Sequence, residues 1–334
     1  MRVGIAGTGF MGTAHAQGWA ETEARIVGFV AETPGEAGGL AGQYGARVYP
    51  SLEAMLPDVD VVDICTPTHL HYEQALLAAQ AGKHIICEKP LALTVAQGQA
   101  MIAACRKAGV RMLVAHVVRF FPEYAQARQI AASGQIGRLG VIRLARGSYR
   151  PKKPVGNWFL DEAKSGGLIL DLMIHDFDYA RWVAGEVESV YAKKVSAAHP
   201  EAERDYALAI LKHRSGALSH IAGAWAYPPP TFRTGLEIAG DGGLVQFDSD
   251  AAAPIFNLIA RRDDAPDVGL PASPVLESPY TTQIKEFYAA LLHDRPARVS
   301  AEDGLAAVQI ALAARESALS GRAVRLEPLV EAAA

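Results

Sequence analysis

Short apolar runs recur through the first third of the chain, and stretches with helical composition separate them. Five runs have this character, at residues 2–6, 25–31, 59–65, 83–87 and 111–118. They are almost solidly apolar, which is typical of strands that are covered on both faces. Strands and helices that alternate at this spacing predict βαβ units and a parallel sheet.

The pattern changes after about residue 119. Longer strand candidates follow at 139–147, 187–195, 207–213 and 216–226, and the tail from 281 to 320 is helical by pattern. Short turns between such strands favour a mostly antiparallel sheet. A chain of 334 residues also exceeds what one hydrophobic core usually organises. The predicted fold class is therefore α/β, with a doubly wound domain over 1–119 and a second α/β domain over 120–334.

Composition and charge narrow the functional classes. Half of the residues are hydrophobic, a fifth are charged, and the net charge is −4, so we expect a globular protein without a nucleic-acid or membrane partner. The three cysteines form no CxxC pair, which argues against a disulfide framework and a thiolate zinc site. The sequence shows neither a signal peptide nor a long apolar segment, and we expect a cytoplasmic protein.

The first motif with a chemical meaning is G-x-G-x-x-G, formed by Gly7, Gly9 and Gly12. It follows a predicted strand and opens a predicted helix, which favours a dinucleotide site over an ordinary glycine-rich turn. Gly7 permits the tight turn, Gly9 lets the backbone approach a pyrophosphate, and Gly12 allows close helix–strand packing. The residues between them, Thr8, Phe10 and Met11, belong to the same candidate cofactor-binding loop, whose N–H groups face the diphosphate.

Two further residues follow predicted strands. Glu32 lies at the distance at which an acid holds the ribose hydroxyls of the cofactor. A carboxylate there repels a 2′-phosphate, so NAD is favoured over NADP. Lys89 ends the fourth strand in Cys87-Glu88-Lys89-Pro90, where a doubly wound sheet binds ligands. The pattern leaves open whether Lys89 points to the nicotinamide or to solvent.

A polar triplet interrupts the apolar stretch SGGLILDLMIHDFD. Asp171, His175 and Asp178 have the spacing i, i+4 and i+7, which predicts that they share one helix face. The face could simply be exposed to solvent. However, apolar residues surround it on most sides, and buried charge is costly unless it is paired or used.

Taken together, five segments resemble the glucose–fructose oxidoreductase / inositol dehydrogenase / MocA-like family. They are GIAGTGFMG, CTPTHLH, CEKPLALT, AHVVRFFPEY and SGGLILDLMIHDFD, in the family's order and spacing. The resemblance implies an N-terminal Rossmann domain and a C-terminal α/β domain built on an open, mostly antiparallel sheet. It also implies a homo-oligomer, a dimer or tetramer, that associates through that sheet. In the family the ribose-binding acid aligns with Ala31, one position before Glu32.

The resemblance also assigns roles to residues. Lys89 matches the lysine of the family's EKP motif, Asp171 and His175 match its acid and histidine, and Asp178 matches a position that contacts a polyol hydroxyl. Further candidates for the cofactor pocket are Thr66, Pro67, His69, His71 and Glu88. Arg119 and Trp158 are further candidates for contact with the substrate. For Arg119 a structural ion pair is equally open, and for Trp158 a place in the core.

The implied chemistry is hydride transfer between nicotinamide and a hydroxyl-bearing carbon of a sugar, cyclitol or related polyol. The hydroxyl proton needs a base, and an imidazole such as His175 suits that role. Lys89 can stabilise the developing alkoxide. The reverse assignment stays open.

Two alternatives are an NAD-dependent glycoside hydrolase of the same build and a non-catalytic sugar or nucleotide sensor. No metal is expected. Asp171 with His175, or His69 with His71, have ligand spacing, but a zinc site needs three or four converging ligands.

Overall fold

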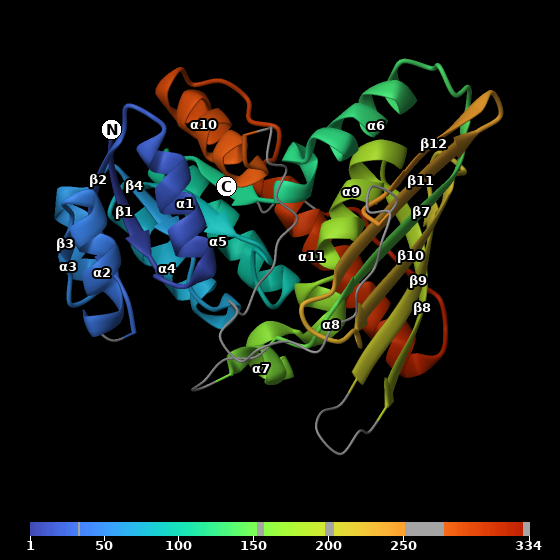
Figure 1. Ribbon diagram of the computed structural model, residues 1–334, viewed down its shortest axis with the longest axis horizontal. Coiled ribbons are helices and arrows are strands. Elements are labelled where there is room, and N and C mark those ends of the chain that lie inside the picture. The colour runs from blue at the N-terminus through green and yellow to red at the C-terminus, as the bar shows by residue number, and fades with distance from the viewer. Residues whose placement is uncertain (33, 152–156, 198–203, 251–276, 330–334) are drawn as a thin grey trace. The chain divides into compact units, whose positions relative to one another are not determined.

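The computed structural model describes residues 1–32, 34–151, 157–197, 204–250 and 277–329 (Figure 1). It divides into two compact units. The first holds the described residues of Met1–Phe120 and Val275–Val308, together with Leu329, and the second holds those of Phe121–Pro274 and Gln309–Pro328. The division expected from sequence placed all of 120–334 in one domain, whereas the segment 277–308 clusters with the first unit.

A six-stranded parallel sheet forms the centre of the first unit, in the order β3-β2-β1-β4-β5-β6. Its strands are β1 (Arg2–Ala6), β2 (Arg25–Val30), β3 (Arg47–Val48), β4 (Val61–Ile64), β5 (His84–Glu88) and β6 (Met112–Ala115). This order and the parallel pairing confirm the predicted doubly wound fold. The short β3 was not anticipated.

Helices separate the strands of this sheet, as the alternating pattern predicted. The helices of this unit are α1 (Phe10–Ala20), α2 (Pro34–Tyr44), α3 (Leu52–Met55), α4 (Thr68–Gln80), α5 (Val95–Ala108) and α10 (Pro279–Leu292), with 3-10 turns at Leu56–Asp58 and Val117–Phe120. Local chemistry sets the bounds of α5. The Thr94 hydroxyl accepts from the Gln97 N–H at its start, and Gly109 ends it with φ of +67°.

The sheet register brings three loops to one edge. Ala6 pairs with Ile64, and Ile64 pairs with Cys87, so β1, β4 and β5 end next to one another. The residues that follow these strands begin the glycine loop, the Thr66-Pro67 loop and the Lys89-Pro90 loop. Ligands of doubly wound sheets bind at this carboxyl edge.

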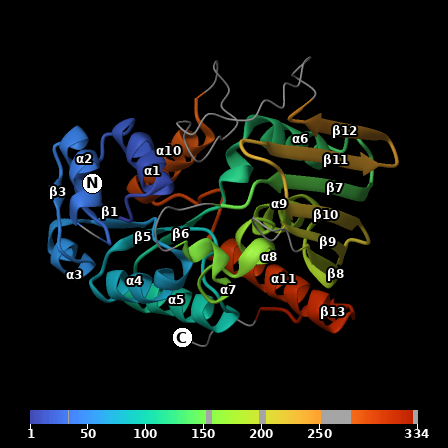
Figure 2. The ribbon, with the colours of Figure 1, turned by 60° about the horizontal axis from the view of Figure 1, so that its bottom comes forward.

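The second unit is built on a seven-stranded mixed sheet, in the order β12-β11-β7-β10-β9-β8-β13 (Figure 2). The strands are β7 (Leu139–Ser148), β8 (Val187–Ala197), β9 (Arg204–His213), β10 (Leu218–Trp225), β11 (Phe232–Gly240), β12 (Gly243–Asp248) and β13 (Val324–Arg325). All neighbours are antiparallel except β7 and β10. The predicted, mostly antiparallel sheet is confirmed, while β11, β12 and β13 were not anticipated.

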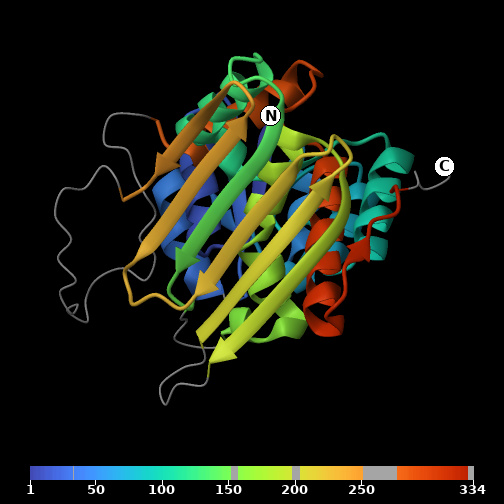
Figure 3. The ribbon, with the colours of Figure 1, turned by 90° about the vertical axis from the view of Figure 1, so that its right-hand side faces the viewer.

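Helices cover one face of this sheet, as Figure 3 shows from the other face. They are α6 (Pro122–Ala132), α7 (Glu162–Ser165), α8 (Gly167–Asp171) and α9 (Ile174–Ala184), with a 3-10 turn at Trp158–Leu160. The helix α11 (Ala301–Ser320) contributes residues to both units. Along β9, buried and exposed residues alternate almost strictly, as expected of a sheet with one covered face.

A buried ion pair ties α9 to this sheet. The Arg146 guanidinium on β7 donates to both oxygens of Asp176, each at 2.9 Å. Asp176 is fully buried, and Arg146 is 5% exposed. Such a bidentate pair fixes geometry as well as neutralising charge, so it sets how α9 lies against its sheet.

None of the described helices is long and apolar enough to span a bilayer.

Candidate functional site

The glycine loop connects β1 to α1. At two of its three glycines the neighbouring backbone leaves no room for a Cβ atom. Gly7 has φ of +99°, and a Cβ there would lie 2.5 Å from the Cys65 carbonyl oxygen. A Cβ on Gly12 would lie 2.0 Å from the Gly7 carbonyl oxygen. Both distances are too short for real contacts, so the chain itself requires glycine at these positions. This is the tight turn and the close packing expected of Gly7 and Gly12.

Gly9 differs from its neighbours, because no heavy atom lies within 4 Å of where its Cβ would be. Packing within the protein therefore does not explain the glycine. An external group that approaches the backbone closely does explain it, and a pyrophosphate at a helix start is such a group. Gly9 and Phe10 are exposed, and Thr8 and Met11 are half-buried. The loop thus fits a dinucleotide.

The candidate ribose acid follows β2. Glu32 is exposed and stands two positions after Val30, where β2 ends, and Ala31 is half-buried. The Gly7 N–H donates to the Val30 carbonyl at 2.8 Å. The end of β2 is thereby tied to the glycine loop, which is where an acid that binds ribose belongs.

A buried histidine joins the next two loops. His71 on α4 is 1% exposed, with Nδ1 2.8 Å from the Pro90 carbonyl oxygen and Nε2 2.9 Å from the Thr66 carbonyl oxygen. Burial lowers the pKa of His71 below its usual value, although these two carbonyls oppose the shift. Both ring nitrogens contact backbone carbonyls of this chain, so the imidazole holds the loop after β4 against the loop after β5. Pro67 and His69, beside it, are half-buried.

Lys89 follows β5 directly and is half-buried. Its backbone N–H donates to Glu88 Oε2 at 3.0 Å, and the Lys89–Pro90 peptide is cis. Glu88 is 5% exposed, so the carboxylate lies inside the unit. Glu88 therefore anchors the backbone of Lys89, rather than lining the loop surface.

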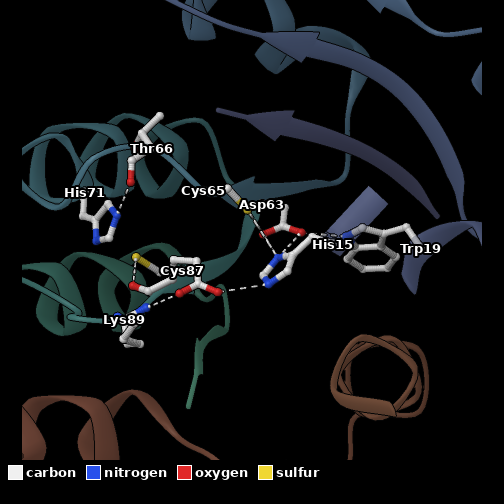
Figure 4. A network of polar contacts seen from close by, with 9 residues as sticks. His15, Trp19, Asp63, Cys65, Thr66, His71, Cys87 and Lys89 are labelled. Atoms are coloured by element: carbon white, nitrogen blue, oxygen red, sulfur yellow. Dashed lines mark hydrogen bonds and ion pairs between the residues drawn. The ribbon is translucent and has the colours of Figure 1, made fainter. Parts of the chain in front are cut away.

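A network of buried polar groups continues from Glu88 towards α1 (Figure 4). His15 Nε2 lies 3.2 Å from Glu88 Oε1, and His15 Nδ1 lies 3.0 Å from both oxygens of Asp63. The Trp19 indole donates to Asp63 Oδ2 at 2.7 Å, and Cys65 Sγ lies 3.5 Å from Asp63 Oδ1. His15 and Asp63 are fully buried. One imidazole thus stands between two buried carboxylates.

The electrostatics of this network favour a charged His15. Burial opposes the charge and on its own would lower the pKa of His15. The Asp63 carboxylate, by its charge and hydrogen bond, and the Cys65 sulfur outweigh burial, so the pKa of His15 lies well above its usual value. Burial raises the pKa of the Cys65 thiol, which keeps it neutral near pH 7.

The polar triplet of the second unit lies on two helices, which corrects the single helix face expected from its spacing. Asp171 is the last residue of α8, while His175 and Asp178 belong to α9. The carbonyl of Leu168 accepts from two successive N–H groups, those of Leu172 and Met173. The turn widens there, and the regular 3.6-residue period is interrupted.

The burial of the triplet excludes a solvated face. Asp171 is 6% exposed, Asp178 is 1% exposed, and His175 is half-buried. Each makes polar or electrostatic interactions. Two acids of the triplet are thus buried, while the imidazole is partly accessible to solvent.

The structure shows the surroundings of Arg119 and Trp158, for each of which the sequence left a substrate contact and a structural role open. Arg119 is 1% exposed and donates to the Arg298 carbonyl at 2.8 Å and to Asp303 at 3.1 Å. These contacts favour its structural alternative. Trp158 is half-buried, and its ring stacks on Phe159 with centroids 3.9 Å apart.

Sequence reasoning missed His15, Asp63, Arg146 and Asp176. A signal was available for Asp63, because this acid interrupts the otherwise apolar strand VVDIC. His15 stands three residues after Gly12 on the same helix, where one polar residue is unremarkable. Its significance comes from Asp63 and Glu88, which are 48 and 73 positions away.

One set of atoms in the described part of the chain has metal-ligand spacing, and it is His15, Asp63 and Cys65. The residues weighed from sequence, Asp171 and His175 or His69 and His71, are not part of it. The donors of this set already bond to one another, to Trp19 and to Glu88. The hydrogen-bond network therefore accounts for the set without an ion.

We expect Gly9→Ala and Gly12→Ala to separate cofactor binding from folding. Gly9→Ala should keep the wild-type melting temperature but weaken NAD⁺ binding about tenfold or more, because its methyl would occupy the path of the pyrophosphate. Gly12→Ala should lower the stability itself, since its methyl collides with the Gly7 carbonyl. Thermal unfolding with and without NAD⁺ measures both. Gly38→Ala, in open space on α2, is the matched control, and equal NAD⁺ affinity in the Gly9 variant contradicts the assignment.

Comparison with known proteins agrees with this geometry. Residues 1–116 match the model of an oxidoreductase family with an NAD-binding Rossmann fold, and residues 124–246 match the GFO/IDH/MocA C-terminal domain. A 1,5-anhydro-D-fructose reductase of Ensifer adhaerens is 31% identical over 276 residues, which is 81% of each chain. A myo-inositol 2-dehydrogenase of Thermotoga maritima is 28% identical and covers 99% of this chain and 100% of its own.

A solved structure extends the similarity to the whole fold. The structure of GenD2 from gentamicin A biosynthesis, in complex with NAD, has a TM-score of 0.87 and 27% identity, and the match covers 98% of this chain and 96% of that one. Both domain models match this chain, and each of these relatives covers most of it. The chain therefore belongs to the GFO/IDH/MocA oxidoreductase family, with its NAD-binding Rossmann fold and its characteristic C-terminal domain.

Proposed function

We propose that the protein is an NAD-dependent oxidoreductase that moves hydride between nicotinamide and a hydroxyl-bearing carbon of a sugar, cyclitol or related polyol. One observation carries the proposal. Lys89 follows β5 at the same sheet edge as the glycine loop, so a cationic side chain accompanies the dinucleotide-binding turn within one unit. A surface lysine at a random strand exit would not need a backbone anchored by Glu88.

Bound NAD⁺ supplies the hydride acceptor. The chain supplies the other requirements, which are binding, orientation and removal of a proton. Gly9 leaves room for the pyrophosphate, the N-terminus of α1 presents N–H groups to it, and Glu32 binds ribose hydroxyls. A carboxylate at Glu32 repels a 2′-phosphate, which favours NAD over NADP.

Lys89 and His175 divide the chemistry at the reacting hydroxyl. Lys89 hydrogen-bonds the oxygen and stabilises its developing negative charge. His175 accepts the hydroxyl proton, a role for which an imidazole is suited near neutral pH. Asp171, at the end of α8, orients His175 or binds a neighbouring hydroxyl, and Asp178 binds a further hydroxyl. Trp158 offers an aromatic face to the sugar ring.

The substrate class follows from the relatives. Their names specify 1,5-anhydro-D-fructose and myo-inositol, which are both polyhydroxylated six-membered rings. Buried acids such as Asp171 and Asp178 are suitable acceptors for the hydroxyl groups of such rings. We therefore propose a polyhydroxylated ring as substrate and leave the choice among such rings to a screen.

We expect Lys89→Met and His175→Gln each to lower kcat by about 100-fold or more, because each removes a group that acts in the transition state. NAD⁺ should still bind with near wild-type affinity. Steady-state kinetics on the best polyol of a screen, followed by the absorbance of reduced nicotinamide, measures kcat, and thermal-shift titration measures binding.

The exposed residues Lys107 and His293 provide matched controls, and Lys107→Met and His293→Gln should leave turnover unchanged. Full turnover in His175→Gln would show that His175 is not the base and would favour Lys89 in that role. Tight NAD⁺ binding without net reduction on any substrate would favour the glycoside hydrolase or the sensor instead.

Glu32 provides a separate test of cofactor choice. Glu32→Ala should weaken NAD⁺ binding and reduce discrimination against NADP⁺, whereas Glu32→Gln should reduce discrimination with a smaller loss of NAD⁺ affinity, since the amide still bonds to hydroxyls. Dissociation constants for both nucleotides measure the ratio. Glu36→Gln, exposed on α2, is the control. An unchanged ratio in both Glu32 variants would show that another group binds the ribose.

We also propose that the protein is a homo-oligomer that associates through the uncovered face of the second sheet. Apolar side chains are exposed there on β8, β9 and β10, namely Tyr191, Val195, Tyr206, Ile210 and Leu218. Tyr191 pairs with Ile210, and Val195 pairs with Tyr206, with the pair of Lys193 and Leu208 between them. The five apolar side chains are called here the apolar strip. An exposed apolar strip of this kind marks an interface.

Light scattering after gel filtration tests this association. We expect a dimer or tetramer for the wild type, and a smaller species for the double variant Val195→Lys, Ile210→Lys, because two buried cations would oppose association. Leu319→Lys, at a residue that is 84% exposed on α11, should leave the mass unchanged. A monomeric wild type, or a double variant of wild-type mass, would reject the proposal.

A further inference from the structure

His15 has a carboxylate at each ring nitrogen. Nδ1 faces Asp63 at 3.0 Å, and Nε2 faces Glu88 at 3.2 Å. A neutral imidazole carries one N–H and can donate on one side, whereas the imidazolium donates on both. Only the charged ring places a proton on both nitrogens, so that Nδ1 bonds to Asp63 while Nε2 lies at ion-pair distance from Glu88. Trp19 and Cys65 complete the set of polar groups around it.

The charge balance of the buried site gives the same result. Asp63 is 0% exposed and Glu88 is 5% exposed, and two carboxylates in such surroundings are costly without a cation. The imidazolium of His15 neutralises one unit of negative charge, hydrogen-bonds to Asp63 and forms an ion pair with Glu88. The two acids come from neighbouring strands, β4 and β5, while His15 comes from α1.

The second oxygen of Glu88 leads directly to Lys89. Glu88 Oε1 faces His15, and Oε2 accepts the Lys89 backbone N–H. On the other side of Lys89, the Pro90 carbonyl contacts His71 of α4. Both chain neighbours of Lys89 are thus held by buried imidazoles from different helices.

We infer that His15 is a positioning residue for Lys89, acting as a cationic bridge that fixes Asp63 and Glu88 and, through Glu88, the backbone of the lysine. The inference rests on the role proposed above for Lys89. The bridge also joins the helix of the dinucleotide loop to the lysine loop. Its effect should therefore appear in turnover more than in cofactor affinity.

The kinetic test compares His15→Asn, Glu88→Gln and the double variant. His15→Asn should lower kcat by about 10- to 100-fold, as expected when a catalytic group is misplaced by a fraction of an ångström to one ångström, while the dissociation constant of NAD⁺ changes by less than about threefold. In the Glu88→Gln background, the same substitution should cost less than about threefold, because the bridge it breaks is already gone.

His84 provides the matched control. It lies at the amino end of β5, where its Nδ1 accepts the Arg111 N–H at 3.1 Å. His84→Asn should leave kcat unchanged. Parallel losses of kcat, NAD⁺ affinity and melting temperature in His15→Asn, with no coupling to Glu88, would overturn the inference in favour of a purely structural role.

A second measurement needs no substrate and separates this inference from the proposed function. Hydrogen exchange followed by NMR should show the Lys89 amide exchanging at least about tenfold faster in His15→Asn, since its bond to Glu88 is loosened. The Gln97 amide, bonded to Thr94 on α5, should exchange at its wild-type rate. An unchanged Lys89 amide would overturn the inference even in an active enzyme.

The wild-type protein gives a further test that does not depend on a variant that folds. Nitrogen-15 shifts of the His15 ring at pH 8 should report both nitrogens as protonated. A neutral ring would overturn the bridge. If no polyol is turned over, the proposed function fails, while the exchange rates and ring shifts still decide whether His15 holds Lys89.

Discussion

The pairing of β1, β4 and β5 is the constraint on which the first unit depends. Parallel strands end at the same edge, and here the register places Ala6, Ile64 and Cys87 side by side. The glycine loop, the Thr66-Pro67 loop and the Lys89-Pro90 loop therefore start from one line of backbone atoms. Loops that start together can serve one extended ligand such as a dinucleotide, which no single loop could enclose.

Buried polar side chains then hold in place the loops and helices that the strand register brings together. His15 links α1 to two strands, and His71 links α4 to two loops. Because the pKa of His15 is raised in the folded protein, its charge stabilises the fold fully below the unfolded-state value of about 6.5. That contribution declines as pH rises through the folded-state value. The second unit uses the same device in Arg146 and Asp176, where removal of either partner would leave an uncompensated charge.

Particular residues show where sequence reasoning was sufficient. Gly7 and Gly12 were assigned from their spacing and from the predicted strand and helix on either side, and the structure supplies the contacts that demand them. The spacing of Asp171, His175 and Asp178 was less informative, because a widened turn at Leu172 and Met173 separates α8 from α9. Periodicity assumes an unbroken helix, and nothing in the apolar stretch SGGLILDLMIHDFD signals the break.

The sequence by itself determined the fold class and the dinucleotide loop, because apolar periodicity and glycine spacing are local properties of the chain. The family followed from five short segments that resemble it, which are local as well. Tertiary structure decided the partners of the buried polar groups. Asp63 interrupts a strand and Glu88 ends one, but only the folded sheet places His15 between them. Likewise, only the fold shows that Arg119 bonds to Arg298 and Asp303. Such pairs join residues far apart in the chain, and pairing at that range follows from packing, which no local pattern encodes.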